Sequence, residues 1–204
     1  GVTFDPRKII SCLFQHNLTR FFPDLMHLLK NLRSRLINKG DFDMNQDKSV
    51  VKQVFNKHQM QEALPWVPEA VWTKSSDAMS DFLPRNLFTL ENALALFKAN
   101  QASAGVFVLI PALMLYAMEE EDIDSENRFN ALLAAYAFLI PINIILDQQA
   151  KITKGTIGTQ NHSKESDKDQ FPFSRRHTEC LLVLAGCMMS VMKRPMKLSR
   201  FSTQ

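Results

Sequence analysis

The stretch from residue 41 to residue 52 is the chain's nearest approach to a metal-binding motif. Oxygen-bearing side chains occupy its alternate positions, as in an EF-hand calcium loop: Asp41, Asp43, Asn45, Asp47 and Ser49. An EF-hand also needs glycine at its sixth position and glutamate at its twelfth, where this chain has Gln46 and Lys52. Because Lys52 would repel the cation, we expect a connecting loop without metal, in which Asp47 caps the following helix.

The other side chains that could do chemistry form no known motif. The five histidines and three cysteines are scattered, with no H-E-x-x-H and no C-x-x-C pair. Neither G-x-x-x-x-G-K-[ST] nor G-x-G-x-x-G occurs, and six glycines are few for a nucleotide-binding fold. We therefore predict no enzyme activity, no cofactor and no metal site. An odd number of unpaired thiols (Cys12, Cys180, Cys187) favours a reducing, intracellular location, either cytoplasmic or nuclear.

Charge is strongly segregated along the 204 residues. The net formal charge is +5 for residues 1–40, −2 for 41–100, −6 for 101–150 and +6 for 151–204. Blocks of opposite sign favour either neutralisation within the chain or contact between neighbouring copies, and basic ends can contact phosphates. The leading hypothesis is therefore a non-enzymatic helical protein that self-associates and binds RNA or other nucleic acid, in a structural role like that of nucleocapsid or matrix proteins.

The nucleic-acid hypothesis assigns specific basic residues at the two ends. Four lie on one expected helix near the N-terminal end, namely Lys30, Arg33, Arg35 and Lys39. Four flank the last apolar run, namely Arg175, Arg176, Lys193 and Arg194. The helix dipole and solubility alone would also account for the first set, because its charges concentrate towards the helix C-terminus.

Two other classes of function remain open. One is a protein interaction adaptor that uses the proline-rich joint with both tryptophans, Trp66 and Trp72, although we expect these rings to be buried. An acidic turn at Glu119, Glu120, Glu121 and Asp122 offers a docking surface for a basic partner, including the basic end of another copy. The other class is attachment to an anionic membrane surface through the last apolar run and its basic flanks.

Helix signals recur along the chain. Leucines at i, i+3, i+4 and i+7 spacing predict a helix that opens near Asp24 and stops at Gly40. Caps and spacing predict further helices after Asp5 and Pro6, after Asp47 (bearing Val50, Val51, Val54 and Phe55), after Ser75 or Ser76 (stopped by Pro84), and after Thr89.

Two apolar runs, residues 104–118 and 131–146, form the centre of the sequence. Each contains one proline, Pro111 or Pro141, which predicts a kink or two shorter helices. Both runs are shorter than the roughly 20 residues that span a bilayer, so a packed helical hairpin is favoured over a membrane hairpin. The expected fold is all-α, with seven to nine helices around this proline-kinked hydrophobic hairpin. The predicted organisation is a core at 1–150, a flexible polar linker at 151–174 and a basic-flanked helix at 175–204, packed on the core as a final helix.

Overall fold

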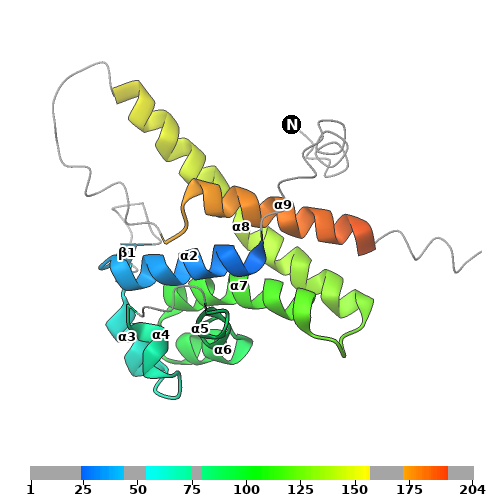
Figure 1. Cartoon of the computed structure of the whole chain (residues 1–204). Helices are drawn as coiled ribbons and strands as arrows, with labels where there is room; N and C mark the ends of the chain where they lie inside the picture. The colour runs from blue at the N-terminus through cyan, green and yellow to red at the C-terminus, as the bar shows by residue number, and fades with distance from the viewer. Residues whose placement is uncertain (1–23, 44–53, 75–79, 157–171, 193–204) are drawn as a thin grey trace, which may run out of the picture.

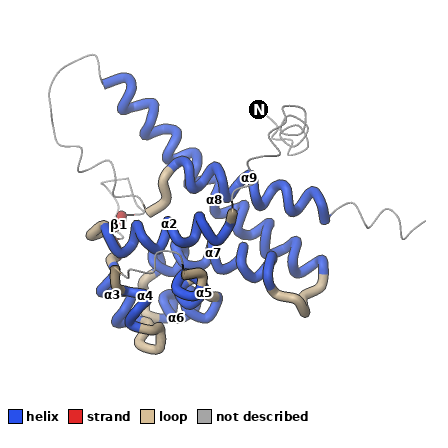
Figure 2. Tube along the Cα trace, viewed as in Figure 1, coloured by secondary structure: helices blue, strands red, loops and turns tan. Residues whose placement is uncertain are grey.

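A computed structural model describes residues 24–43, 54–74, 80–156 and 172–192. Within these ranges the chain forms eight helices and one short two-stranded ribbon, and 77% of it is helical, which confirms the all-α class (Figures 1 and 2). The helices are α2 (Leu25–Asn38), α3 (Lys57–Ala63), α4 (Glu69–Trp72), α5 (Phe82–Leu87), α6 (Leu90–Lys98), α7 (Ala102–Glu119), α8 (Ser125–Thr156) and α9 (Arg175–Met192). The helix expected after Asp5 and Pro6 lies outside the described residues.

Helix α2 begins and ends where its sequence predicts. The Oδ1 atom of Asp24 accepts a hydrogen bond from the backbone N–H of Met26 at 2.9 Å, which satisfies a donor that the first turn leaves free. The helix ends at Asn38, two residues before Gly40. Its buried face consists of Leu25, Leu28, Leu29, Leu32 and Leu36. The 3.6-residue period of the leucines therefore indicated both the helix and its inner face.

A two-stranded antiparallel ribbon replaces part of the expected third helix. Strand β1 (Phe42–Asp43) pairs with β2 (Val54–Phe55), with Phe42 opposite Phe55. The helical prediction for Val54 and Phe55 is therefore wrong, because β-branched and aromatic side chains also suit extended backbone and here pair across the ribbon. Helix α3 starts only at Lys57 and is capped by Asn56. Asp47, Val50 and Val51 lie outside the described residues.

Pro84 does not stop the helix in which it stands. It is the third residue of α5, where its missing N–H costs nothing because the first-turn donors have no acceptor within the helix. The prediction that Pro84 ends a helix is therefore wrong.

Thr89 caps α6 as expected, since its side-chain oxygen accepts a hydrogen bond from the backbone N–H of Asn92 at 3.1 Å. Residues 75–79, which include the other expected cap, are outside the described part.

Helices α7 and α8 form the central hairpin, and each runs continuously through its proline, Pro111 or Pro141. The turn is fastened by Arg128, whose guanidinium donates to the carbonyls of Ala117 at 2.5 Å and Glu120 at 2.6 Å. A cation bound to these last carbonyls of α7 stabilises its negative dipole end. The two apolar runs thus pack against each other, as the sequence predicts.

Helix α8 is longer than its apolar run. It continues to Thr156, so residues 151–156, expected to be linker, are helical, and Figure 1 shows this end projecting from the body. Helix α9 packs across α8, and its Leu181, Leu184 and Ala185 are buried in the common core. The division of the chain into core, linker and terminal helix stays a prediction, because residues 157–171 and 193–204 are outside the described part.

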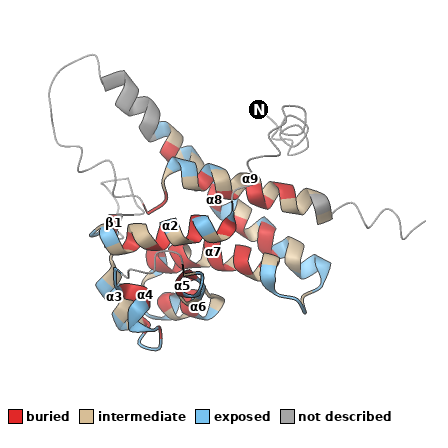
Figure 3. Cartoon of the chain, in the orientation of Figure 1, coloured by how far each residue is buried: buried red, intermediate tan, exposed pale blue. Residues whose placement is uncertain are grey.

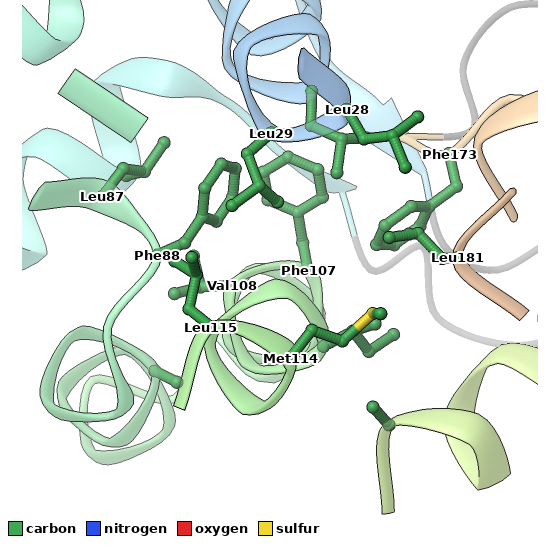
Figure 4. Close-up of a cluster of buried hydrophobic side chains, with 14 of the residues drawn as sticks. Leu28, Leu29, Leu87, Phe88, Phe107, Val108, Met114, Leu115, Phe173 and Leu181 are labelled. Atoms are coloured by element: carbon green, nitrogen blue, oxygen red, sulfur yellow. The ribbon is translucent and has the colours of Figure 1, made fainter. Parts of the chain in front are cut away.

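The core centres on the aromatic ring of Phe107 in α7. Four other phenylalanine rings lie around it, with centroid distances of 6.4 Å to Phe42, 5.5 Å to Phe55, 5.8 Å to Phe88 and 5.5 Å to Phe173. Figure 4 shows Leu29 of α2 near the ring of Phe107 and Leu181 of α9 beside Phe173, and Figure 3 shows buried residues concentrated where these helices meet. Tilted and edge-on ring pairs of this kind add stability beyond simple burial.

Arg33 of α2 is a structural residue in this core. Its side chain is only 6% exposed, and its guanidinium donates to the backbone carbonyls of Val71, Ala70 and Thr73, each at 2.9 Å. These carbonyls belong to α4 and the residue that follows it. Burial lowers the pKa of Arg33 from its usual value, since desolvation disfavours the charged form. A buried cation is thus held by carbonyl dipoles and fixes α4 against α2.

We predict that Arg33→Met destabilises the fold by about 2–3 kcal/mol, because three backbone carbonyls, of which that of Val71 is buried, lose a charged donor. Urea unfolding followed by circular dichroism measures the change in the free energy of unfolding. Lys74→Met is the matched control, since Lys74 is exposed next to the same segment and its loss should cost less than about 0.5 kcal/mol. Equal stability of the two variants would contradict the structural role of Arg33.

Candidate interaction surfaces

The four basic residues predicted on α2 do not share one solvent-facing side. Arg33 is buried, and its Nε and Nη2 atoms donate to three backbone carbonyls, so it does not lie on the outer face where the sequence pattern placed it. Lys30 forms an ion pair with Asp81. Arg35 and Lys39 are half-buried at the C-terminal end of the helix. The basic face of α2 is therefore smaller than its sequence suggests.

The arginines predicted at the other end of the chain begin α9. Arg175 and Arg176 are exposed in its first turn, and Arg175 pairs with Asp147 of α8 at 3.1 Å and with Glu179 at 2.8 Å. These pairs offset the unfavourable placing of cations at the positive end of a helix dipole. Lys193 and Arg194 lie outside the described residues.

Arg35 of α2 and Arg176 of α9 both lie near enough to His177 for their charges to act on its ring. Burial lowers the pKa of His177 from its usual value of 6.5, and the positive charges of Arg35 and Arg176 lower it further. The Oγ atom of Ser174 lies 2.6 Å from Nδ1 of the same ring. We call Arg35, Arg175, Arg176 and His177 the basic cluster. Arg35, predicted at one basic end, and Arg176, predicted at the other, thus both act on the same histidine.

The two tryptophans lie in different environments. Trp72 is 1% exposed and belongs to the core, as expected for this joint. Trp66 is 59% exposed, contrary to the expectation that both rings are buried, and its Nε1–H donates to Oδ1 of Asn92 at 2.9 Å. Asn92 in turn donates to the carbonyls of Asn86 and Leu87, so the exposed ring of Trp66 is held in a fixed orientation.

The acidic turn between α7 and α8 is exposed along Glu119, Glu120, Glu121 and Asp122. Glu119 pairs with Arg85 of α5. Figure 1 shows the turn at the opposite end of the body from the start of α9. The acidic turn therefore does not neutralise the basic cluster of its own chain.

Sequence reasoning missed an apolar surface on the outer side of α8. Leu133, Phe138, Ile140 and Ile144 are 38–51% exposed, and Ala137 and Pro141 are exposed among them. We call Leu133, Ala137, Ile140, Pro141 and Ile144 the α8 stripe, because helical spacing places them on one side of the helix. The opposite side, which includes Leu132, Ala135, Leu139 and Ile142, is buried. The signal was present in the sequence, since the run 131–146 is apolar on all sides of the helix.

Two helices in the described part are long and apolar enough to cross a membrane by length and composition, namely Ala102–Glu119 and Ser125–Gln148. In the first helix, 61% of the apolar segment is buried within the protein, as in the core helix of a folded domain. In the second helix, only 33% of the apolar segment is buried, since its outer side carries the α8 stripe. The exposed apolar surface of the hairpin therefore belongs to α8.

We predict that Arg176→Gln raises the pKa of His177, because a neighbouring positive charge that opposes imidazolium formation is removed. NMR titration of the His177 ring protons measures the change. Arg175→Gln is the matched control, since Arg175 pairs with Asp147 and Glu179 and is not among the charges that lower this pKa. A His177 pKa that is unchanged in Arg176→Gln would contradict the effect of the Arg176 charge on this ring.

The lowered pKa of His177 makes the stability of the fold depend on pH. The unfolded chain protonates His177 near its usual pKa of about 6.5, whereas the folded chain does so only at lower pH. The unfolded state therefore binds more protons, and His177 makes the fold less stable as the pH falls below about 6.5.

In the part of the chain that the structure describes, no group of three or more His, Cys, Asp or Glu side chains is placed to hold a metal ion. Comparison with protein-family models, curated proteins and solved structures finds no match to this chain. The function is therefore inferred from the surfaces described above.

Proposed function

We propose that the protein is a non-enzymatic helical interaction protein that self-associates through the outer side of α8. The observation that supports this is the α8 stripe, whose large side chains are 38–51% exposed although they lie on the longest helix of the core hairpin. Contiguous exposed apolar surface on a folded protein commonly marks an interaction site. A single exposed apolar residue, such as Phe82, carries no such meaning.

Burial of the α8 stripe would supply a useful driving force. Full burial of a leucine or isoleucine side chain stabilises by about 1.5–3 kcal/mol, and roughly half of each side chain is still exposed here. Leu133, Ile140 and Ile144 together would therefore contribute a few kcal/mol, before the cost of association is subtracted. That balance is typical of reversible association.

The charge layout also favours contacts between copies. The acidic turn and the basic cluster lie at opposite ends of the body, so each is available to the complementary charge of a neighbour (Figure 1). Complementary charges of this kind raise the rate of association and favour the correct partner, and they add less to the binding affinity. The apolar α8 stripe would supply the affinity.

We expect light scattering to give a mass above the 23.3 kDa of one chain, rising with concentration. Ile144→Glu should keep the mass near that of one chain, because association would bury a carboxylate without a partner. The matched control is Leu94→Glu, an equally exposed apolar residue on α6 that should leave association unchanged. A wild-type chain that stays at 23.3 kDa at every concentration would disprove self-association.

Nucleic-acid binding is the second candidate, and the position of both Arg35 and Arg176 near His177 favours it. Two cations from distant parts of the chain can contact neighbouring phosphates once folding brings them together. Arg33 takes no part in this proposal, because it is buried and its Nε and Nη2 atoms donate to backbone carbonyls. Such binding would show an affinity for nucleic acid that falls as the salt concentration rises.

The double variant Arg35→Gln/Arg176→Gln should bind single-stranded RNA more weakly in a filter assay. Each lost phosphate contact should reduce the slope of log affinity against log salt by about 0.7. Lys98→Gln, an exposed cation on α6, is the control and should change neither quantity. If the wild-type protein shows no salt-dependent RNA affinity, this second candidate is wrong.

A further inference from the structure

Trp66 is an exposed aromatic residue whose ring is held in one position. It is 59% exposed, although tryptophan is usually well buried, and its neighbours Leu64 and Val67 are buried in the core. The indole N–H donates to Oδ1 of Asn92, a side chain that is itself 2% exposed. A ring fixed in this way loses little conformational entropy when a partner covers it, which suits an anchor for binding.

The hydrogen bond to Asn92 determines what the ring of Trp66 can offer to a partner. Indole has a single polar hydrogen, and Asn92 already accepts it. The ring therefore presents its two faces, whose negative π-electron density attracts a cation or stacks on another flat group. A partner of Trp66 is recognised through these faces rather than through a hydrogen bond to the indole.

Helices α3, α4 and α6 form one group in the body, and the ends of these helices meet at Trp66 (Figure 1). Trp66 follows the end of α3 and bonds to Asn92 in the first turn of α6. At the far end of the same two helices, Gln101 after α6 donates to the carbonyl of Gln59 in α3 at 3.0 Å. Helices α3 and α6 are therefore antiparallel, with the end of α3 beside the start of α6.

Each of these three helices carries an exposed glutamate at the end beside Trp66. Glu62 lies in the last turn of α3, while Glu69 and Glu91 lie in the first turns of α4 and α6. Oε2 of Glu69 accepts a hydrogen bond from Nε2 of Gln61 at 2.9 Å, which ties α4 to α3. We call Trp66, Glu62, Glu69 and Glu91 the Trp66 surface.

The lysines of the same group stand at the opposite ends, namely Lys57 at the start of α3, Lys98 at the end of α6 and Lys74 shortly after α4. The helix dipole alone explains α4 and α6, because it favours acidic residues in a first turn and basic residues in a last turn. It does not explain α3, whose lysine is in the first turn and whose glutamate is in the last. Negative charge is thus placed beside Trp66 against the dipole preference of α3. Arg85 of the neighbouring α5 is paired with Glu119.

We infer that the Trp66 surface binds an arginine- or lysine-rich segment of a partner protein. A guanidinium or ammonium group over the ring is attracted by the π-face, and the carboxylates beside it attract the same charge. These carboxylates repel phosphates, which favours a basic protein segment over nucleic acid at this ring. The inference is independent of self-association, because none of these residues belongs to the α8 stripe.

Titration with a hexa-arginine peptide, followed by NMR of the full-length chain, tests this inference. The chain has two tryptophans, so Trp66→Phe assigns the two indole N–H signals, and the core residue Trp72 is the internal reference. Hexa-arginine should shift the Trp66 signal in a saturable way and leave the Trp72 signal in place. Measurement at about 0.15 M salt limits the influence of distant charges, because the Debye length is then about 8 Å.

The triple variant Glu62→Gln/Glu69→Gln/Glu91→Gln should raise the dissociation constant of hexa-arginine about fivefold, because three attractions of exposed charges are lost. The matched control is Glu120→Gln/Glu121→Gln/Asp122→Asn, which makes the same change in net charge in the acidic turn. Figure 1 shows this turn at the other end of the body from α3 and α4. The control should keep the dissociation constant measured at Trp66 within about twofold of wild type. An unchanged Trp72 signal verifies that the core of each variant is intact.

Three results would overturn the inference. The first is a Trp66 signal that hexa-arginine does not move. The second is equal weakening by the two triple variants, which would mean that the peptide responds only to the net charge of the protein. The third is an equal shift with a hexaglutamine peptide or with single-stranded RNA, which would mean that the ring binds without a cation or stacks on bases.

Discussion

The packing of four phenylalanine rings around Phe107 holds together segments from almost the whole described chain. Phe42 and Phe55 come from the short ribbon, Phe88 directly follows α5, and Phe173 lies just before α9. A two-residue strand or a single turn before a helix buries too little surface to be stable alone. Each of these segments becomes ordered because its ring has a fixed place against α7. The position of α9 across α8, and with it the basic cluster, follows from this aromatic core.

Arg33 shows how a basic residue can serve the fold rather than a ligand. Its Nε and Nη2 atoms donate to three backbone carbonyls, which stabilise the positive charge inside the protein at the junction of α2 and α4. A count of lysines and arginines along the chain therefore overestimates the positive surface. What remains exposed depends on contacts between distant segments, as at Arg176.

Local signals predicted those elements whose cause is local. Asp24 and Thr89 cap the helices that they were expected to cap, and the leucine period of α2 matches its buried face. The ribbon could not be predicted in this way, because Val54 and Phe55 become a strand only by pairing with residues 42 and 43. The sites depended even more on tertiary structure. The outer side of α8 is apolar in sequence like its inner side, and only the number of neighbouring helices determines which residues stay exposed.

The order of the central helices also bears on how the chain folds. Helices α6, α7 and α8 follow one another closely in sequence and each packs against the next, so their contacts need only short loops to close. Closing a short loop costs little entropy, so contacts between these neighbouring helices form early in folding. The contacts of Phe107 with Phe42 and Phe173 close much longer loops. We expect the three-helix unit to assemble first, with its outer α8 surface already present before the aromatic core is completed.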